Sequence, residues 1–159
     1  MNYWQSFYKN IRLHKKIDFP SQFAIFCIGE QKSASNLIEF GCGNARDAYF
    51  FSKYYKNVYA FDKSKFAIDY NKKKFSKSKN LHFHKYDIND KFDFSYIKNK
   101  KKTIYARFFL HTLTNEEIII FIKLCRYLLD KNERVFCEYR TYKDKSKKKV
   151  FKKHFRNYL

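Results

Sequence analysis

One short stretch constrains the fold of this chain more than any other, the sequence EFGCGNARDA at residues 39–48. An apolar run over residues 36–40 leads directly into two glycines, and a segment with helical character follows over residues 46–55. This order is typical of a strand, a tight turn and a helix in a nucleotide-binding α/β unit. The stretch therefore predicts a loop that holds a cofactor, and the neighbouring residues decide which cofactor fits.

The rest of the chain alternates between strand and helix patterns. Pro20 and Ser21 end a first helical segment over residues 2–16 and cap a second one. Thr114 and Glu117 form a capping box before a strongly apolar helix. Alternation from residue 36 to 140 predicts an α/β, Rossmann-like sheet, mainly parallel, with helices on both faces and ligands at the carboxyl ends of the strands. The expected strands are 36–40, 58–61, 81–87, 103–109 and 133–139, and the later helices are 22–31, one from 64, and 115–129.

The residues around the glycines distinguish between cofactors. Arg46 occupies the small third position of the dinucleotide fingerprint, and the Lys and Ser/Thr of a P-loop are missing, so NAD and ATP fit poorly. S-adenosylmethionine (SAM) fits better, because glycines let the backbone approach the methionyl group. Asp62 ends the second strand, where it suits the ribose hydroxyls, and Asp87 ends the third, near the adenine amino group. Such acids are often only turn residues, but three features in this order favour a SAM site.

On these motifs the chain resembles the class I SAM-dependent methyltransferases. EFGCGNARDA is similar to the first motif of that family, AFDKS at 60–64 to its ribose site and YDIND at 86–90 to its adenine site. A softer likeness, over about residues 3–158, is to small bacterial methyltransferases encoded with capsule or other surface-polysaccharide genes. It rests on the aromatic N-terminal helix, PSQFA at 20–24, YARFFLH at 105–111 and EYRT at 138–141.

The resemblance implies contacts to SAM and to its product, S-adenosylhomocysteine (SAH). It also implies a helical lid over residues 1–34, a Rossmann-like core over 35–140 and a basic segment over 141–159, all within one domain of residues 1–159. The implied cofactor contacts are Glu39, Gly41, Cys42, Gly43, Asn44, Arg46, Asp62, Lys63, Asp87, Ile88 and Arg107; the lid and substrate contacts are Trp4, Tyr8, Ser21, Gln22, Phe23 and Arg140, with Tyr3 beside them.

Two features depart from the family pattern. Ala45 stands at the third glycine of the loop, which suits an alanine if its φ is negative. The family also continues into a sixth strand and an antiparallel seventh, whereas this sequence stops at HFRNYL, so we expect a C-terminally shortened sheet lacking part of that hairpin. A SAM-binding but inactive fragment, or a subunit that needs a partner chain, is therefore an alternative to an active enzyme, and the oligomeric state stays open.

The sequence narrows the class of molecule that can accept the methyl group. Pro20 is the only proline, which excludes the Asn/Asp-Pro-Pro-Tyr and Pro-Cys motifs of several base and protein methyltransferases. We expect O-methylation of a small molecule or glycan precursor, with His111 as candidate general base; the alternative is a histidine held by a purely structural hydrogen bond. Arg107 and Arg140 end strands and suit an anionic acceptor, the alternative being surface charge.

The positive charge of the chain leaves one alternative function open. The chain has 35 Lys and Arg against 15 Asp and Glu, a formal net charge of +20, which attracts polyanions and keeps an RNA methyltransferase as an alternative. Lysine runs among many Phe, Tyr, Ile and Asn also follow from an A/T-rich coding sequence, and we favour that explanation.

The remaining composition points to the cytoplasm. Four cysteines without a Cys-x-x-Cys pair are typical of reduced thiols, and no apolar run approaches the roughly 18 residues of a membrane span. We expect a soluble, cytoplasmic protein with no membrane partner. His82 and His84 share a strand face without a third ligand nearby, so no metal site is expected.

Overall fold

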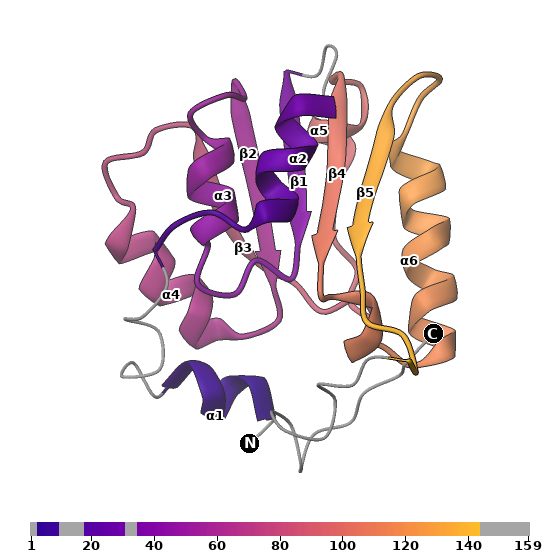
Figure 1. Cartoon of the computed structure of the whole chain (residues 1–159), viewed down its shortest axis with the longest axis horizontal. Coiled ribbons are helices and arrows are strands. Elements are labelled where there is room, and N and C mark those ends of the chain that lie inside the picture. Colours follow the sequence, from indigo (N-terminus) through magenta and orange to yellow (C-terminus); the bar gives the residue numbers. More distant parts are fainter. Residues whose placement is uncertain (1–2, 10–17, 31–34, 144–159) are drawn as a thin grey trace.

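The computed structural model describes residues 3–9, 18–30 and 35–143. Five parallel strands form one sheet in the order β3-β2-β1-β4-β5 (Figure 1). This confirms the predicted Rossmann-like α/β fold. The strands are β1 (Asn36–Phe40), β2 (Asn57–Asp62), β3 (Leu81–Lys85), β4 (Lys102–Arg107) and β5 (Arg134–Glu138).

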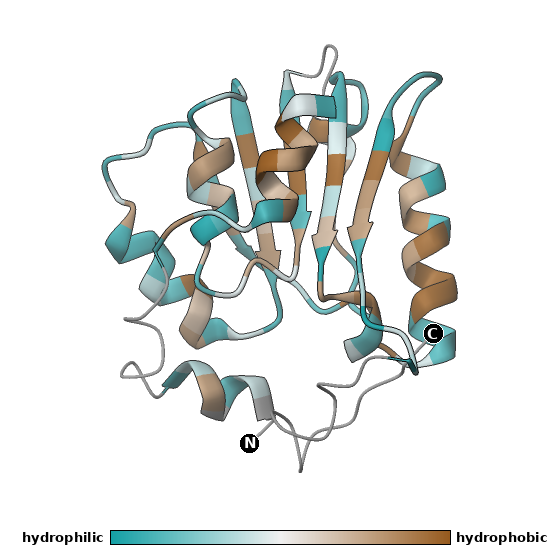
Figure 2. Cartoon of the chain, in the orientation of Figure 1, coloured by the Kyte–Doolittle hydropathy of each residue, from teal (hydrophilic) through white to brown (hydrophobic). Residues whose placement is uncertain are grey.

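The strand patterns explain why this sheet is buried. The residues of β1 are all buried, as are all but one residue of β2 and of β4, as expected for central strands covered on both faces. Figure 2 shows the hydrophobic residues in the middle of the strands and polar residues where strands end. The register pairs Phe40 of β1 with Phe61 of β2 and Ala106 of β4, so the carboxyl ends of these strands lie at one edge.

Helices cover both faces of the sheet. One apolar cluster joins the helices within residues 22–74 to one face of the sheet, and a second joins the helices within residues 95–128 to the opposite face. The helix that starts at Arg46 is shorter than expected, because the chain turns from Ser52 onward. The helices are α1 (Tyr3–Lys9), α2 (Gln22–Glu30), α3 (Arg46–Phe51), α4 (Lys65–Lys74), α5 (Ser95–Lys98) and α6 (Asn115–Leu128), with a 3₁₀ turn at Leu110–Thr112.

The helix starts follow the predicted capping residues. The Ser64 hydroxyl accepts a hydrogen bond from the Ala67 N–H at the start of α4, and Thr114 with Glu117 forms the reciprocal capping box of α6. The Ser21 hydroxyl likewise accepts from the Ala24 N–H at the start of α2. These local bonds fix where each of the three helices begins.

A buried ion pair joins Lys102 at the start of β4 to Glu133 in the segment between α6 and β5, and Lys102 also contacts the end of α6. The ammonium of Lys102 has no exposed side-chain surface and donates to Glu133 Oε2 at 2.8 Å and to the Leu128 carbonyl at 2.8 Å. A second oxygen of Glu133 accepts the Lys102 N–H. Since every one of these donors has an acceptor, the pair connects the two elements without leaving a buried charge alone.

The first helix lies apart from both layers. In Figure 1, α1 lies below the carboxyl ends of the strands and leaves the two faces of the sheet to the other helices. Its closest helical neighbour is α4, and the Gln5 side chain donates to the Lys63 carbonyl at the end of β2. Its position therefore closes the edge of the sheet at which cofactors bind in such folds.

Candidate functional site

A pocket of about 560 Å³ opens at the carboxyl edge of the sheet, between the strand ends and α1. This size is ordinary for a small-molecule or cofactor site. The predicted site residues that line it are Trp4, Tyr8, Glu39, Gly41, Cys42, Gly43, Asn44, Arg46, Asp62, Lys63, Asp87, Ile88, Arg107, His111 and Arg140. The structure thus brings together side chains from the lid, the glycine loop and the ends of all five strands.

The glycines of the loop are required by both conformation and space. Gly41 and Gly43 have φ angles of 75° and 53°, in the left-handed region. A Cβ on Gly41 would lie 2.9 Å from Phe109 Cδ2, and a Cβ on Gly43 would overlap the hydroxyl of Tyr8. Any larger residue would therefore strain the loop and displace side chains that line the pocket.

Ala45 does not have the negative φ that the sequence analysis required. Its φ is 58°, in the left-handed region that glycine adopts without strain. The cause is local, because the Ala45 N–H donates to the Cys42 carbonyl at 2.8 Å and closes the turn before α3. The left-handed backbone costs an L-residue about 1–2 kcal/mol. The loop keeps its shape at the expense of stored backbone strain.

Asp62 holds the glycine loop against the end of β2. Its Oδ2 accepts the Gly43 N–H at 2.9 Å, and its Oδ1 accepts the Ser64 N–H at 2.8 Å. Burial raises the pKa of Asp62, although these two backbone hydrogen bonds lower it. A carboxylate oxygen accepts more than one hydrogen bond, so this group can also accept from a bound diol.

Glu39 is the unsatisfied acid of the pocket. Its Oε2 is buried and has no hydrogen-bond partner among the described residues. Burial raises the pKa of Glu39 well above its ordinary value, and repulsion from Asp47 and Asp62 raises it further. A buried acceptor without a donor is costly, so this position favours a ligand that brings a donor or a positive charge.

The end of β3 contributes both an acid and apolar side chains to the wall of the pocket. The Asp87 carboxylate accepts the Asn89 N–H at 3.2 Å, which forms a turn directly after the strand. Tyr86 and Ile88 on either side of it are buried and line the same pocket. The acid can accept a hydrogen bond from the edge of a heteroaromatic base, and the apolar side chains can pack against the face of that base.

The lid contacts come from α1 alone. Trp4 and Tyr8 stack with ring centres 6.0 Å apart, and both line the pocket together with Phe7. The side chain of Tyr3 and residues 10–17 lie outside the described residues. Among the described residues of the predicted lid, those that line the pocket belong to the aromatic helix α1.

Ser21, Gln22 and Phe23 do not line this pocket, contrary to the sequence analysis. The Ser21 hydroxyl donates to Asp47 Oδ2 at 2.8 Å, and the Tyr105 hydroxyl donates to the same oxygen at 2.8 Å. Phe23 stacks on the Tyr105 ring, whereas Gln22 is exposed. The reason is that α2 packs on the face of the sheet, where these residues fix α2 to β4 and α3.

The ends of β4 and β5 carry the basic part of the pocket. Phe108 follows β4 with a φ of 53°, which is a genuine backbone outlier for a bulky residue. Its ring centre lies 4.1 Å from the guanidinium carbon of Arg107 and 5.0 Å from that of Arg140. Arg107 Nε also pairs with Glu138 Oε2. One aromatic ring therefore gathers two arginines at the pocket.

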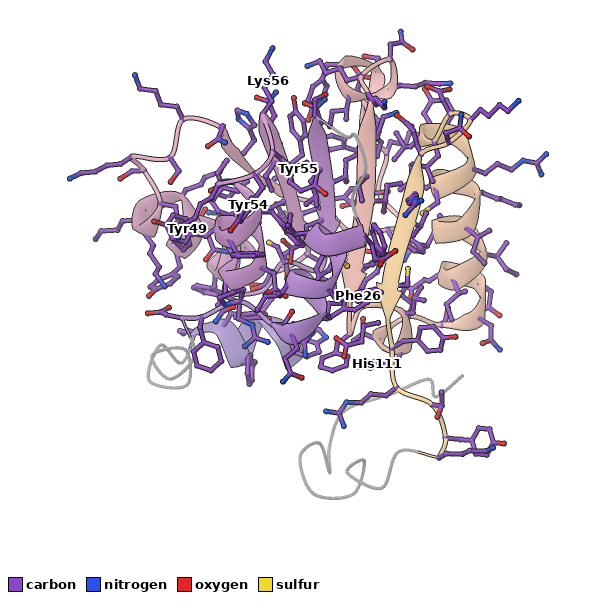
Figure 3. The ribbon with its side chains drawn as sticks, turned by 45° about the horizontal axis from the view of Figure 1, so that its top comes forward. Phe26, Tyr49, Tyr54, Tyr55, Lys56 and His111 are labelled. Atoms are coloured by element: carbon purple, nitrogen blue, oxygen red, sulfur yellow. The ribbon has the colours of Figure 1, made fainter. Side chains whose placement is uncertain are left out.

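His111 lies in the 3₁₀ turn after β4 and is buried. Figure 3 shows it at the carboxyl edge, beside the chain that leaves β5. Its Nδ1 accepts the Arg140 N–H at 3.4 Å, which in a neutral ring places the proton on Nε2. This hydrogen bond connects the loops after β4 and β5, and His111 lines the pocket.

Several lining residues were not singled out from the sequence. They lie at the ends of strands, in the segments after β3 and β4, near the starts of α3 and α6, or in α1, and most of them carry no chemical signal of their own in the sequence. They are Phe7, Phe40, Asp47, Phe61, Tyr86, Phe108, Phe109, Thr112, Leu113 and Glu117.

The fold and the pocket define an α/β domain that binds a nucleotide-type cofactor at the carboxyl ends of parallel strands. Residues 37–132, more than half of the chain, match the methyltransferase domain family, and the chain belongs to this family. SAM is accordingly the cofactor class of the site. A comparison with curated protein sequences gave no match.

Solved structures share the fold at low sequence identity. Phosphoethanolamine N-methyltransferase 1 from Haemonchus contortus has a TM-score of 0.69 at 12% identity over 87% of this chain and 32% of its own. A SAM-dependent methyltransferase from Anabaena variabilis has a TM-score of 0.62 at 19% identity, over 86% of this chain and 61% of its own. A TehB-like SAM-dependent methyltransferase from Corynebacterium glutamicum has a TM-score of 0.61 at 15% identity, over 84% and 69%. The chain thus spans less than two thirds of the first two.

The pocket fits SAM. The unpartnered Oε2 of Glu39 suits the ammonium of the methionyl group, and the Asp62 carboxylate suits the ribose hydroxyls. The two glycines leave the space that the backbone needs to approach a ligand. Because SAM carries a net positive charge, a pocket whose β1, β2 and β3 ends are acidic is electrostatically matched to it.

Two absences apply to the described part of the chain. No helix there is long and apolar enough to cross a membrane. No group of three or more His, Cys, Asp or Glu side chains lies within reach of one metal ion in those ranges.

Proposed function

We propose that this chain is a SAM-dependent methyltransferase that O-methylates a small-molecule or glycan-precursor acceptor, for example a surface-polysaccharide precursor. The observation that carries the proposal is the set of acids at neighbouring strand ends: Glu39, Asp62 and Asp87 surround a glycine loop in one pocket. A cationic cofactor matches this set, and the basic side of the same pocket offers room for the acceptor.

SAM, when bound, supplies an activated methyl group for an in-line displacement. The contribution of the chain is to hold donor and acceptor in line, which is worth about 7–11 kcal/mol at best. Asp62 and the loop glycines orient the cofactor end, and the aromatic side chains of α1 exclude water from above. The low proline content and the absence of a base-specific motif support a small acceptor.

His111 completes the proposal as the candidate group to take the proton of an acceptor hydroxyl, because it lines the pocket. Its Nδ1 accepts the Arg140 N–H, so Nε2 donates in the neutral ring, and uptake of the acceptor proton requires Nδ1 to exchange that backbone hydrogen bond. His111→Asn separates the two roles, because Asn retains an acceptor for the Arg140 N–H and cannot act as a base. If His111 is the base, this variant loses about 10²–10⁴-fold in kcat. A structural histidine predicts near-normal kcat.

The proposal is tested by titrating the full chain with SAM and SAH. Trp4 is the only tryptophan and lines the pocket, so its fluorescence reports binding directly. We expect saturable binding that Asp62→Ala weakens at least tenfold, since that variant removes the group that holds the loop and accepts from the ribose. The matched control Asp69→Ala changes an exposed carboxylate on α4 and should bind normally. A folded chain that binds neither compound would refute the proposal.

A further inference from the structure

We infer that Asn71 of α4 is a positioning residue for the cofactor: it holds the Gly43 carbonyl and thereby keeps the glycine loop and Asp62 in the shape that binds SAM. The inference rests on the proposed function for the cofactor, whereas the hydrogen bond itself is a feature of the chain. Asn71 is completely buried and lies outside the residues that line the pocket, so it acts through the loop and not by contact with a ligand.

Asn71 is the polar exception on the buried face of α4. The buried residues of this helix are Ala67, Ile68 and Asn71, whose spacing of three and four residues places them on one face. An apolar side chain is the usual occupant of such a position, because a buried amide is costly unless it is hydrogen-bonded. The bond to Gly43 is what an amide supplies here and an apolar side chain cannot.

The direction of this hydrogen bond follows from its acceptor. Asn71 Nδ2 donates to the Gly43 carbonyl at 2.8 Å. The opposite orientation of the amide would set its oxygen against a carbonyl oxygen, and two acceptors cannot share a hydrogen bond. Asn71 Oδ1 is buried and has no hydrogen-bond partner among the described residues. Within the described part of the chain, the NH₂ group therefore supplies the polar contact of this side chain.

Side chains from outside the loop hold both polar groups of the Gly43 backbone. The Gly43 N–H donates to Asp62 Oδ2 at 2.9 Å, and the Gly43 carbonyl accepts from Asn71. Asp62 Oδ1 in turn accepts the N–H of Ser64, the cap of α4, and α4 leads back to Asn71. The loop, the end of β2 and the first turns of α4 thus form one closed ring of contacts. Loss of the bond from Asn71 or from Asp62 opens this ring.

The ring determines which side of Gly43 faces the pocket. Gly43 lines the pocket with a φ of 53°, and a Cβ on it would overlap the hydroxyl of Tyr8, so its Cα is turned toward α1. A glycine reaches many other backbone angles at little cost, so this conformation has to be imposed by its surroundings. Without the bond from Asn71, the peptide group after Gly43 can rotate, and Asp62 loses the fixed partner that orients its carboxylate.

Asn71→Leu tests this role. The change exchanges one unpartnered buried oxygen, Asn71 Oδ1, for another, the Gly43 carbonyl, and leucine suits the buried face of α4, so we expect the variant to fold. It should weaken SAH binding, followed by Trp4 fluorescence, about tenfold, at the upper end of the range for the loss of one hydrogen bond. In an Asp62→Ala background the same substitution should weaken binding less than about twofold, because the ring is already open.

Asn80→Leu is the matched control. The Asn80 amide is half-buried and likewise donates to loop carbonyls, those of Ser52 and Tyr55, but this loop precedes β2 and lies at the opposite edge of the sheet from the pocket. The control should lower the free energy of unfolding and leave the affinity for SAH unchanged. A merely structural role of Asn71 predicts the same behaviour for Asn71→Leu.

Hydrogen exchange of the Gly43 N–H tests the ring without a ligand. In the free chain, Asn71→Leu should accelerate this exchange relative to the wild type, and Asn80→Leu should not. Equal exchange rates or equal SAH affinities in Asn71→Leu and the wild type, or additive losses of affinity in the variant that also carries Asp62→Ala, would overturn the inference. A wild type that does not bind SAH, with the exchange still accelerated in Asn71→Leu, would count against the proposed function and support the ring.

A measurement on the wild type decides the matter if Asn71→Leu does not fold. The side-chain NH₂ resonances of Asn71 should shift when SAH saturates the chain, whereas those of Asn80 should not. Unshifted Asn71 resonances in a chain that binds SAH would overturn the inference.

Discussion

Ala45 carries a conformational cost that a single substitution can measure. Ala45→Gly relieves about 1–2 kcal/mol of left-handed strain and loses about 0.8 kcal/mol of methyl burial, so we expect an unchanged or slightly higher free energy of unfolding. Ala48→Gly is the matched control, an equally buried alanine inside α3. It should lose about 2 kcal/mol in urea unfolding, from helix propensity and burial together. Equal losses in the free energy of unfolding of both variants would show that Ala45 carries no backbone strain.

Because Glu39 is buried in the pocket, we predict that cofactor binding is coupled to the release of a proton from its carboxyl group. Burial raises the pKa of Glu39 in the free chain, so the protonated form persists to a higher pH than in an exposed glutamate. A bound ammonium beside Oε2 favours the carboxylate, lowers this pKa and expels a proton. The affinity for SAM should therefore rise with pH until the free chain has itself lost the proton.

Calorimetry can detect this proton. Titrations in two buffers with different ionisation enthalpies should give different apparent enthalpies, and the difference should vanish in Glu39→Gln. Identical enthalpies in both buffers for the wild type would show that Glu39 binds SAM without changing its protonation.

At the scale of elements, the buried pair of Lys102 and Glu133 holds the segment between α6 and β5 to the start of β4. Glu133→Ala should cost about 3–5 kcal/mol, because it leaves the Lys102 ammonium buried without its counter-charge. The exposed pair of Lys65 and Asp69 is the control, and Asp69→Ala should cost under about 1 kcal/mol.

A double variant identifies the cause of that loss. Lys102→Met combined with Glu133→Leu removes both charges and should recover most of the stability that Glu133→Ala loses. If the double variant is as unstable as the single one in thermal unfolding, the effect comes from packing and not from an unpaired charge.

At the scale of the whole molecule, the net charge of +20 predicts RNA binding without specificity. An interaction through 6–10 phosphates loses roughly 10³–10⁵ in affinity between 50 and 200 mM salt. We expect a short single-stranded RNA to follow this steep loss, with no effect of SAH on its affinity. Binding that survives 200 mM salt and is weakened by Arg140→Gln would instead favour the alternative of an RNA methyltransferase.

The sequence predicted the pocket residues best where a residue type that suits the cofactor stands at the end of a strand. The glycine loop, Asp62 and Asp87 line the pocket as expected, because each stands directly after a strand, and their contacts to the cofactor stay a prediction. Ser21 and Phe23 were misplaced because their resemblance to a lid motif says nothing about which face of the sheet α2 covers. The assignment of residues 141–159 and of a shortened sheet stays a prediction, because residues 144–159 lie outside the described ranges.

By itself, the sequence determined the order of the strands and of the longer helices along the chain, the caps at Ser21, Ser64 and Thr114, and the place of the glycine loop, but not the short helix α5. These depend on hydrogen bonds and burial patterns within a few residues of each other, as the capping box at Thr114 illustrates. Only the tertiary structure decided the left-handed φ of Ala45, the approach of Arg107 and Arg140 around Phe108, and the tie from His111 to the end of β5. Each joins segments whose spacing is set by the packing of the sheet, and packing depends on contacts that no local pattern encodes.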